Sequence, residues 1–245
     1  MQMYCFKTIE KNKEYIERIE AAGFDAIAVT VDTPLFGFRR ADIYNNFEMP
    51  PHLKYGNVKQ AYGENMKESP RKKGEGFLTH YLRTNHELEI GWDNIIDFKK
   101  LTKLKLIVKG VMCEEDAAEC AKYAKQGVID AVWVSNHGGR QLDETLSTIE
   151  ALPGIVKQLK GMVPVWFDSG VRKGTDALKA LALGADLVFI GRPIVWGLAA
   201  LGQAGVEGVL DVLDDELKRA MILSGVSSVK EIQSKNIIYR QVPRL

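Results

Sequence analysis

The segment from Ser135 to Gln141 (SNHGGRQ) holds the side chains with the clearest capacity for chemistry. His137 is able to take up a proton near neutral pH, and Arg140 is able to bind a carboxylate through two parallel hydrogen bonds. Gly138 and Gly139 lie between them and allow a tight backbone turn. The spacing predicts a site that deprotonates a small carboxylic acid. The competing interpretation is that the two side chains only cap the end of a strand.

Three further charged side chains stand at or just beyond the ends of apolar runs, and each has two or more interpretations. Asp32 would hold the tautomer of His137 as its ionised partner, or it would form a salt bridge with Arg40. Arg39 would be a second ligand of the carboxylate, or an ordinary surface charge. Lys109 would be a Schiff-base nucleophile, a fixed positive charge beside a developing anion, or a lysine whose stem is buried while its ammonium group reaches solvent.

Glycine-containing turns follow the last two apolar runs. These turns are 168–174 (DSGVRKG) and the pair Gly191 and Arg192. Barrel proteins often bind phosphate at this place, through backbone N–H groups and the N-terminus of the next helix. The guanidinium groups of Arg172 and Arg192 favour an anion there. The residues therefore predict a phosphate-bearing ligand beside a histidine–arginine carboxylate site, and they do not name the ligand.

Short apolar runs alternate with longer segments of helical spacing along the chain. Apolar runs of this length are typical of strands that are buried on both faces. Gly23, Gly127 and Gly184 follow three of the helical segments, as helix C-caps do. The alternation predicts right-handed βαβ crossovers and a parallel sheet, hence an α/β protein. The expected strands are 2–6, 26–31, 106–111, 131–134, 163–167 and 187–190, and the expected helices are 9–22, 114–125, 148–159 and 175–183.

Polar or glycine-containing clusters follow nearly every expected strand, which favours a (β/α)8 barrel over an open sheet with one switch point. Six strands are fewer than the barrel needs, so we expect a barrel that lacks roughly its first two βα units. Two such units would precede Met1 in a longer protein, or the chain is an incomplete product. We expect one domain over 1–245, interrupted by an excursion at about 46–101. Within it, 67–76 (KESPRKKGEG) is expected to be a solvated loop, with a lid over the barrel mouth as the alternative.

The amino-acid composition excludes several classes of protein. The 245 residues are 46% hydrophobic and 27% charged, and the net charge is +1. These values exclude low-complexity disorder and give no general electrostatic reason to bind nucleic acid or an acidic membrane surface. No apolar run in the sequence approaches the roughly 18 residues of a membrane span. Cys5, Cys113 and Cys120 lack the spacing of a disulfide framework, and 1–15 lacks the apolar core of a secretion signal, so an intracellular protein is expected.

The remaining histidines fall inside the excursion. His52, His80 and His86 are separated from the strand ends that carry the other candidate residues. We therefore expect their side chains to be solvated.

The segment from Ser135 to Asp143 (SNHGGRQLD) is similar to the active-site signature of the FMN-dependent 2-hydroxy acid oxidase and dehydrogenase family, which includes glycolate oxidase. The resemblance covers nearly the whole chain and weakens between about His52 and Asp97. The expected strand 2–6 resembles the third barrel strand of the family. The other matching segments are 26–34 (AIAVTVDTP), 108–111 (VKGV), 167–172 (FDSGVR) and 189–193 (FIGRP).

The resemblance implies a role for each matching residue. His137 would be the base, with Asp32 as its partner. Arg140 and Arg39 would bind the substrate carboxylate, and Tyr4 would hydrogen-bond the substrate near its hydroxyl. FMN would be the cofactor, and no metal is expected. The residues that match flavin-binding positions are Gln2, Thr30, Lys109, Ser135, Asp168, Gly170, Arg172, Gly191 and Arg192; among them Lys109 would lie near the N1/O2 edge of the flavin.

The resemblance also implies an activity. It is the oxidation of a small (S)-2-hydroxy acid to the 2-oxo acid, with oxygen as the acceptor that yields hydrogen peroxide, in a homotetramer without nucleic-acid or membrane partners. Two alternatives stay open: a truncated homologue without activity of its own, and a phosphosugar aldolase or isomerase of the same barrel class with Lys109 as its nucleophile. The last residues, 243–245 (PRL), are a variant of a peroxisomal targeting tripeptide, so the expected location is peroxisomal or otherwise cytoplasmic.

Overall fold

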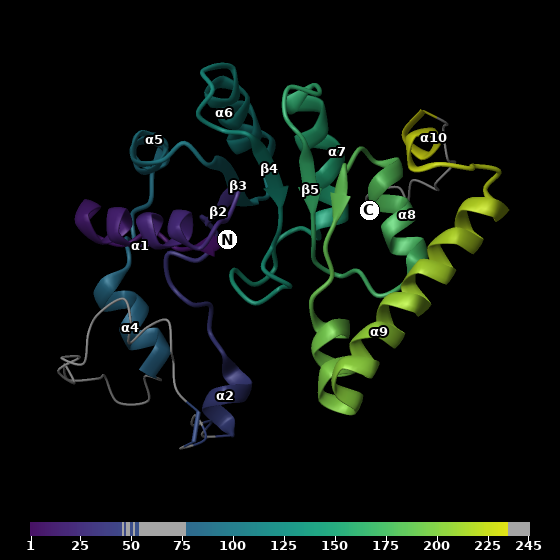
Figure 1. The fold of residues 1–245 in the computed structure, drawn as a ribbon, viewed down its shortest axis with the longest axis horizontal. Helices are drawn as coiled ribbons and strands as arrows, with labels where there is room; N and C mark the ends of the chain where they lie inside the picture. Colours follow the sequence, from purple (N-terminus) through teal and green to yellow (C-terminus); the bar gives the residue numbers. More distant parts are fainter. Residues whose placement is uncertain (46, 48–49, 51, 54–76, 235–245) are drawn as a thin grey trace. The chain divides into compact units, whose positions relative to one another are not determined.

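The computed structural model describes residues 1–45, 47, 50, 52–53 and 77–234 (Figure 1). The expected loop or lid at 67–76 and the terminal tripeptide at 243–245 lie outside these residues. The chain divides into two compact units. The first unit comprises the described residues of Met1–Lys109 together with Arg140–Asp143, and the second comprises Gly110–Gly139 and the described residues from Glu144 onward. Strands alternate with helices in both units, as the sequence pattern predicts.

The strands of the first unit are β1 (Gln2–Met3), β2 (Ala26–Thr30) and β3 (Lys105–Val111, in this unit up to Lys109), and they pair in parallel in this order. Thr30 and Lys109 are partners in the register of β2 and β3. Because parallel strands share one direction, the residues that follow β1 and β2 lie at the same edge of the sheet as the end of β3.

The helices of the first unit are α1 (Ile9–Ala21), α2 (Arg40–Tyr44), α4 (Phe77–Asn85) and α5 (Trp92–Leu101). Helix α1 ends where expected, with Gly23 in the left-handed region at φ +78°. The segment treated as an excursion is thus partly helical, because it contains α4 and α5. The sequence of this segment did not predict either helix.

Strand β1 is shorter than the expected 2–6, because the chain beyond it pairs with a different segment. Phe6 and His86 form an isolated antiparallel bridge. The backbone N–H of Glu87 donates to the carbonyl of Cys5 at 2.9 Å, and the N–H of Lys7 donates to the carbonyl of Asn85 at 3.1 Å. The chain that follows α4 is therefore hydrogen-bonded to the chain that follows β1.

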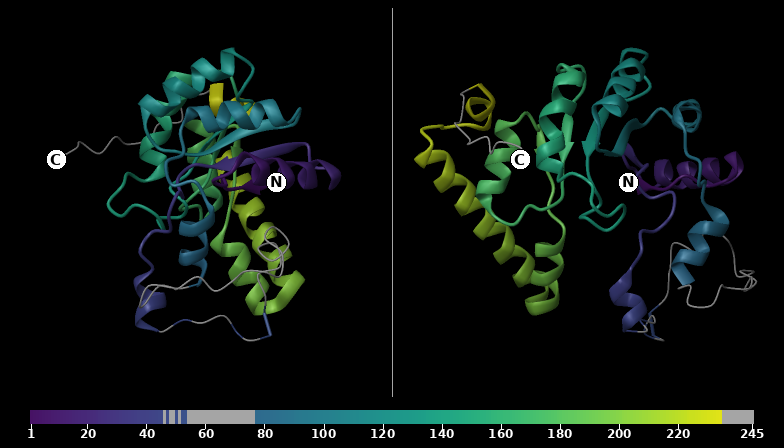
Figure 2. Two further views of the ribbon diagram at one scale, coloured as in Figure 1. Left: turned by 90° about the vertical axis from the view of Figure 1, so that its left-hand side faces the viewer. Right: turned by 180° about the vertical axis from the view of Figure 1, so that it is seen from behind.

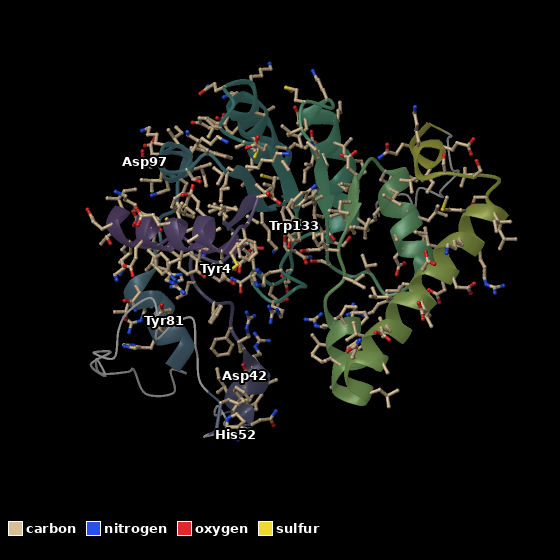
Figure 3. The ribbon with its side chains drawn as sticks, in the orientation of Figure 1. Tyr4, Asp42, His52, Tyr81, Asp97 and Trp133 are labelled. Carbon is tan, nitrogen blue, oxygen red and sulfur yellow. The ribbon has the colours of Figure 1, made fainter. Side chains whose placement is uncertain are left out.

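The strands of the second unit are β4 (Ala131–Val134), β5 (Val165–Phe167) and β6 (Leu187–Val188), again paired in parallel and in sequence order. Strand β5 begins later than expected, after Pro164, which has no N–H group for a sheet ladder. Trp133 lies on β4 (Figure 3). Its ring stacks on the ring of Phe189, with the ring centroids 4.0 Å apart. The polar residues that follow β4, β5 and β6 lie at the carboxyl edge of this sheet.

The helices α6 (Glu114–Lys125), α7 (Thr148–Leu159) and α8 (Gly174–Ala182) follow strands, as in βα units. The first two have the expected bounds. Helix α8 lies alongside the long arm of α9, both from the front and from behind (Figures 1 and 2). A buried cluster of Leu178, Leu181, Ala220, Val226 and Ile232 fills the space between α8, α9 and α10 (Val229–Ser234).

Helix α9 (Arg192–Leu223) is not among the helices that the sequence pattern predicts. By length and composition alone it qualifies as a membrane-spanning helix, contrary to the expectation that no apolar run is long enough. However, Leu201 and Gly202 have non-helical backbone angles and divide it into two arms. A Cβ on Gly197 would lie 2.5 Å from the Gly205 carbonyl oxygen, so the arms approach each other closely beside this break. The first arm is shorter than the about 20 residues of a span, and acidic and basic residues run through the second.

Candidate active site

Polar side chains gather at the carboxyl edge of the sheet in the first unit. The amide Nε2 of Gln2 donates to the hydroxyl of Thr30 at 2.7 Å. Lys109, the register partner of Thr30, is only 9% exposed. Tyr4 directly follows β1, and Asp32 lies two residues beyond β2. The structure thus brings together side chains that the sequence assigned to flavin and to substrate.

Tyr4 is held as a neutral phenol. Burial raises the pKa of Tyr4, and the carboxylate of Asp32 raises it further. The charges of Arg140 and Arg39 and a hydrogen bond with Gln2 act in the opposite direction and are smaller causes. A neutral phenol keeps its O–H, so Tyr4 is able to donate a hydrogen bond over the physiological pH range.

Arg39 and Arg140 lie near enough to repel each other. Burial lowers the pKa of Arg39, and the positive charge of Arg140 lowers it further, whereas Asp42 and Tyr4 raise it. The Arg39 guanidinium also lies over the ring of Phe36, 5.4 Å from its centroid. Two neighbouring guanidinium groups favour an anion between them, because the anion removes their mutual repulsion. The pair predicted to bind the substrate carboxylate is therefore assembled in the structure.

Gln141 holds this region together, a role that the sequence pattern did not predict. Its Oε1 accepts hydrogen bonds from Nη2 of Arg39 at 3.0 Å and from the backbone N–H of Gly37 at 3.2 Å. Its Nε2 donates to the carbonyls of Asp32 at 3.0 Å and Leu35 at 2.8 Å. The only sequence signal for this role was the position of Gln141 beside Arg140 in the signature segment.

Gly37 allows the close approach that these hydrogen bonds need. A Cβ atom at this position would lie 2.5 Å from the carbonyl oxygen of Gln141 and even closer to that of Arg140. Any side chain at position 37 would therefore push the segment after β2 away from residues 140–141.

In the second unit, the segment after β4 forms a tight turn. His137 has φ +57°, a left-handed conformation that is uncommon for a residue other than glycine, and Gly138 and Gly139 continue in the same region. The backbone N–H of His137 donates to the hydroxyl of Ser135 at 3.1 Å, and that of Gly139 donates to Oδ1 of Asn136 at 3.0 Å. The predicted turn is confirmed, and its own side chains hold it.

The candidate phosphate residues follow β5 and β6. Gly170 has φ +79°, and a Cβ on Gly170 or on Gly191 would meet no described atom within 4 Å, so the backbone at both turns is open. Gly191 is the N-cap of α9, where backbone N–H groups carry partial positive charge. Arg172 is exposed and stacks over the ring of Trp196, 5.0 Å from its centroid. Open backbone, a helix N-terminus and guanidinium groups suit a phosphate monoester.

Arg192 and Asp168 are linked to the turn that carries His137. Nη2 of Arg192 donates to the carbonyl of Gly138 at 3.0 Å. The hydroxyl of Ser169 donates to Oδ1 of Asp168 at 2.6 Å and accepts the backbone N–H of Gly138 at 2.9 Å. The second unit therefore joins the predicted base and the predicted cofactor residues through hydrogen bonds.

The prediction that His86 is solvated is wrong. His86 is 5% exposed and packs against the rings of Tyr4, Phe6 and Tyr81, with centroid separations of 5.7, 4.8 and 5.6 Å. Burial lowers its pKa to about 4. Neither ring nitrogen has a hydrogen-bond partner among the described residues. The antiparallel bridge to Phe6, which joins distant segments, brings this histidine into the interior.

The other two histidines of the excursion differ from each other in how far they are exposed. His52 is exposed, as predicted. His80 is half-buried, with its Nδ1 atom 3.2 Å from Nη2 of Arg83. Within the described residues, no three or more His, Cys, Asp or Glu side chains gather in an arrangement that could hold a metal ion.

The chain matches the family model described as FMN-dependent dehydrogenase over residues 1–239. It is 44% identical to 2-hydroxyacid oxidase 1 of Mus musculus over 95% of this chain and 61% of that protein. It is 43% identical to glycolate oxidase of Spinacia oleracea over 96% of this chain and 62% of that protein. The chain thus spans about three fifths of the length of these relatives.

A solved structure of mandelate oxidase with (S)-4-hydroxymandelic acid matches 95% of this chain and 63% of its own, with 34% identity and a TM-score of 0.83. Mandelate oxidase in a further crystal structure gives a TM-score of 0.80 at 33% identity. These likenesses confirm the predicted fold class, an α/β barrel of which about six parallel strands are present. On the extent of the family match and of these identities, the chain belongs to the FMN-dependent dehydrogenase family of flavin oxidoreductases.

Proposed function

We propose that the protein containing this chain oxidises a small (S)-2-hydroxy acid to the 2-oxo acid, with oxygen as the final acceptor and hydrogen peroxide as the second product. The observation that carries the proposal is the assembly of Arg39 and Arg140 beside the neutral phenol of Tyr4. A paired cation binds a carboxylate, and a phenol next to it is placed to contact the hydroxyl on the adjacent carbon.

The residues fit FMN at both of its ends. Asp168, Arg172 and Arg192, with the open backbone at Gly170 and Gly191, would hold the ribityl chain and the phosphate. Residues at the ends of strands β1 to β4 would contact the ring: Gln2, Thr30, Lys109 and Ser135. Lys109 would place its positive charge at the ring edge that becomes anionic on reduction. When bound, FMN supplies the two-electron acceptor that the side chains of this chain lack.

The protein side chains supply binding and proton transfer. Arg39 and Arg140 hold the carboxylate and so fix the orientation of the carbon that bears the hydroxyl. Tyr4 donates a hydrogen bond to that hydroxyl oxygen. His137 accepts a proton from the hydroxy acid, and Asp32 as its partner would stabilise the resulting imidazolium. The acid loses two electrons and two protons overall: His137 takes one proton, and both electrons and the other proton would pass to bound FMN.

The test uses the full-length protein with bound FMN and its His137→Gln variant. Anaerobic addition of glycolate, lactate or a longer 2-hydroxy acid should bleach the absorbance of the oxidised flavin in the parent. The variant should keep the colour and lose at least a thousandfold in bleaching rate, because the proton acceptor is gone. Absence of bleaching by every short 2-hydroxy acid would reject the activity, and undiminished bleaching in the variant would reject His137 as the base.

A second measurement tests whether the 245-residue chain by itself binds FMN. Equilibrium dialysis of the 245-residue chain against FMN reports whether the assembled phosphate residues retain the cofactor. Micromolar or tighter retention would support a functional cofactor site in this part of the protein. Retention that Arg172→Ala leaves unchanged would contradict the assigned phosphate site.

A further inference from the structure

Two non-glycine residues with left-handed backbone lie at the ends of neighbouring strands in the second unit. His137, after β4, has φ +57°, and Ser169, after β5, has φ +77°. This conformation is disfavoured for both residue types, since the Cβ atom crowds the backbone. A glycine at position 169 would adopt the same φ without strain, so the serine is retained at a cost to backbone stability. Such an outlier points to a use for the side chain.

The hydroxyl of Ser169 makes a hydrogen bond in each direction. It donates to Oδ1 of Asp168 at 2.6 Å and accepts the backbone N–H of Gly138 at 2.9 Å. That N–H belongs to the peptide group that joins His137 to Gly138, so the bond restrains the ψ angle of His137. Alanine and glycine both lack the atom that makes this connection.

The surroundings hold Ser169 and Gly138 in place. The hydroxyl of Thr148, a buried residue at the start of α7, donates to the carbonyl of Ser169 at 3.3 Å. The carbonyl of Gly138 accepts from Nη2 of Arg192 at 3.0 Å. Both polar backbone groups of Gly138 are therefore bonded to residues that follow the next two strands, β5 and β6.

We propose that Ser169 is a positioning residue, whose hydroxyl joins the His137–Gly138 peptide to Asp168 and so fixes the base relative to the carboxylate that would bind the ribityl chain. The roles of His137 and Asp168 in this inference rest on the proposed function. Ser169 acts through His137 and does not itself touch the substrate. Its loss should therefore slow proton transfer much more than it weakens binding of the substrate carboxylate, which depends on Arg39 and Arg140.

The test compares Ser169→Ala with Ser169→Gly. Both variants lose the hydroxyl, but only the glycine variant also removes the backbone strain. In the full-length flavoprotein, both should lower the limiting rate of anaerobic flavin reduction at least tenfold and change the dissociation constant of the 2-hydroxy acid less than threefold. If the glycine variant reduces its flavin at the parent rate, the hydroxyl has no positioning role and the inference fails.

A second readout needs no turnover. Hydrogen exchange resolved to single amides should show the Gly138 amide exchanging at least tenfold faster in both variants. The Gly139 amide, bonded to Asn136, is the internal reference within the same turn. Unchanged exchange at Gly138 would overturn the inference even if the reaction were slowed. Failure of the parent protein to oxidise any 2-hydroxy acid would instead reject the proposed function and leave the exchange result standing.

Ser227→Ala is the matched control. The Ser227 hydroxyl donates to Oε2 of Glu231 at 3.0 Å, next to α10 and away from the turns described above. This variant loses a serine hydrogen bond of the same kind. It should leave the Gly138 exchange rate and the flavin reduction rate as they are in the parent.

Discussion

The side-chain amide of Gln141 holds the guanidinium of Arg39, with Oε1 of Gln141 3.0 Å from Nη2 of Arg39. The same amide is bonded to backbone groups of Asp32, Leu35 and Gly37. One side chain thus fixes the path of the segment after β2 and the direction of an arginine in that segment. Precise placement of a carboxylate ligand requires such support, because a free arginine side chain has many rotamers.

Replacing Gln141 with alanine should weaken binding of the 2-hydroxy acid. Arg39 would lose its hydrogen-bonded orientation, and a hydrogen bond to a charged group contributes about 1.5–3 kcal/mol, or roughly ten- to a hundredfold in affinity. We expect KM to rise by at least tenfold and kcat to change less. Steady-state kinetics of the full-length protein measures both constants.

Gln203→Ala provides the comparison for this variant. Gln203 is an exposed residue whose Nε2 donates to Oε1 of Glu207 at 2.7 Å on α9. Its loss should leave KM unchanged. Equal KM values for Gln141→Ala and the parent would show that Arg39 does not need the amide.

Replacing Gly37 with alanine should destabilise the protein and displace the segment after β2. The new Cβ would overlap the carbonyl oxygens of Arg140 and Gln141, both of which are backbone atoms that cannot rotate away. Overpacking of this kind costs about 1–3 kcal/mol. Urea unfolding followed by circular dichroism measures the loss, and a raised KM would report the displaced arginines.

Gly208→Ala is the control, and it should change the stability in the opposite direction. Gly208 lies in α9, and a Cβ there would meet no described atom within 4 Å. This substitution should increase stability by about 0.5–1 kcal/mol, since alanine favours the helix. A Gly37→Ala protein as stable as the parent would contradict the close approach seen in the structure.

The burial of His86 predicts that the stability of the protein depends on pH. Burial lowers the pKa of His86 to about 4, whereas a solvated histidine in the unfolded chain has a pKa near 6.5. Between these values the unfolded chain binds more protons than the folded chain, so the stability present above pH 6.5 is lost as the pH falls toward 4. The loss attributable to His86 at pH 5 is about 2 kcal/mol.

Replacement of His86 by phenylalanine should remove this part of the acid sensitivity. It should also raise the stability at pH 7 by about 1–3 kcal/mol, because it replaces buried nitrogen atoms with an apolar ring. Urea midpoints at pH 7 and pH 5 test both statements. His52→Gln, at an exposed position, should retain the acid sensitivity of the parent. Identical pH dependence in His86→Phe and the parent would place the acid sensitivity elsewhere.

Tyr4 should act as a hydrogen-bond donor that does not ionise in the working range. Burial and Asp32 raise its pKa above the ordinary value of 10. Tyr4→Phe should therefore lower the limiting rate of flavin reduction by about tenfold, which corresponds to 1.4 kcal/mol, without changing the shape of the pH–rate profile between pH 7 and 9. Stopped-flow measurements across that range record the rate and the profile together.

Tyr44→Phe is the control, because Tyr44 is 81% exposed at the end of α2. It should react at the parent rate. A titration near pH 8 that is present in the parent and absent from Tyr4→Phe would show that the phenol ionises, against the expectation from its burial.

Much of the fold could be predicted from the local sequence. Helices α6 and α7 and strand β4 begin and end where the sequence pattern predicts, and Gly23, Gly127 and Gly184 take up the positive φ expected of C-caps. These features depend on neighbouring residues, through hydrophobic spacing and backbone preference. The same holds for the turn at 137–139, where the glycines and the hydrogen bonds of Ser135 and Asn136 are encoded within a few residues.

The residue types at the strand ends, and with them the class of chemistry, follow from the order of amino acids alone. Three features required the packed structure: Gln141 bonds to residues about a hundred positions earlier, His86 is buried against Tyr4, and α9 is divided at Gly202. Each of these depends on a partner far away in the chain or on a backbone angle that glycine permits but does not require. Spacing along a sequence records neither, because long-range contacts are formed only when the whole chain packs.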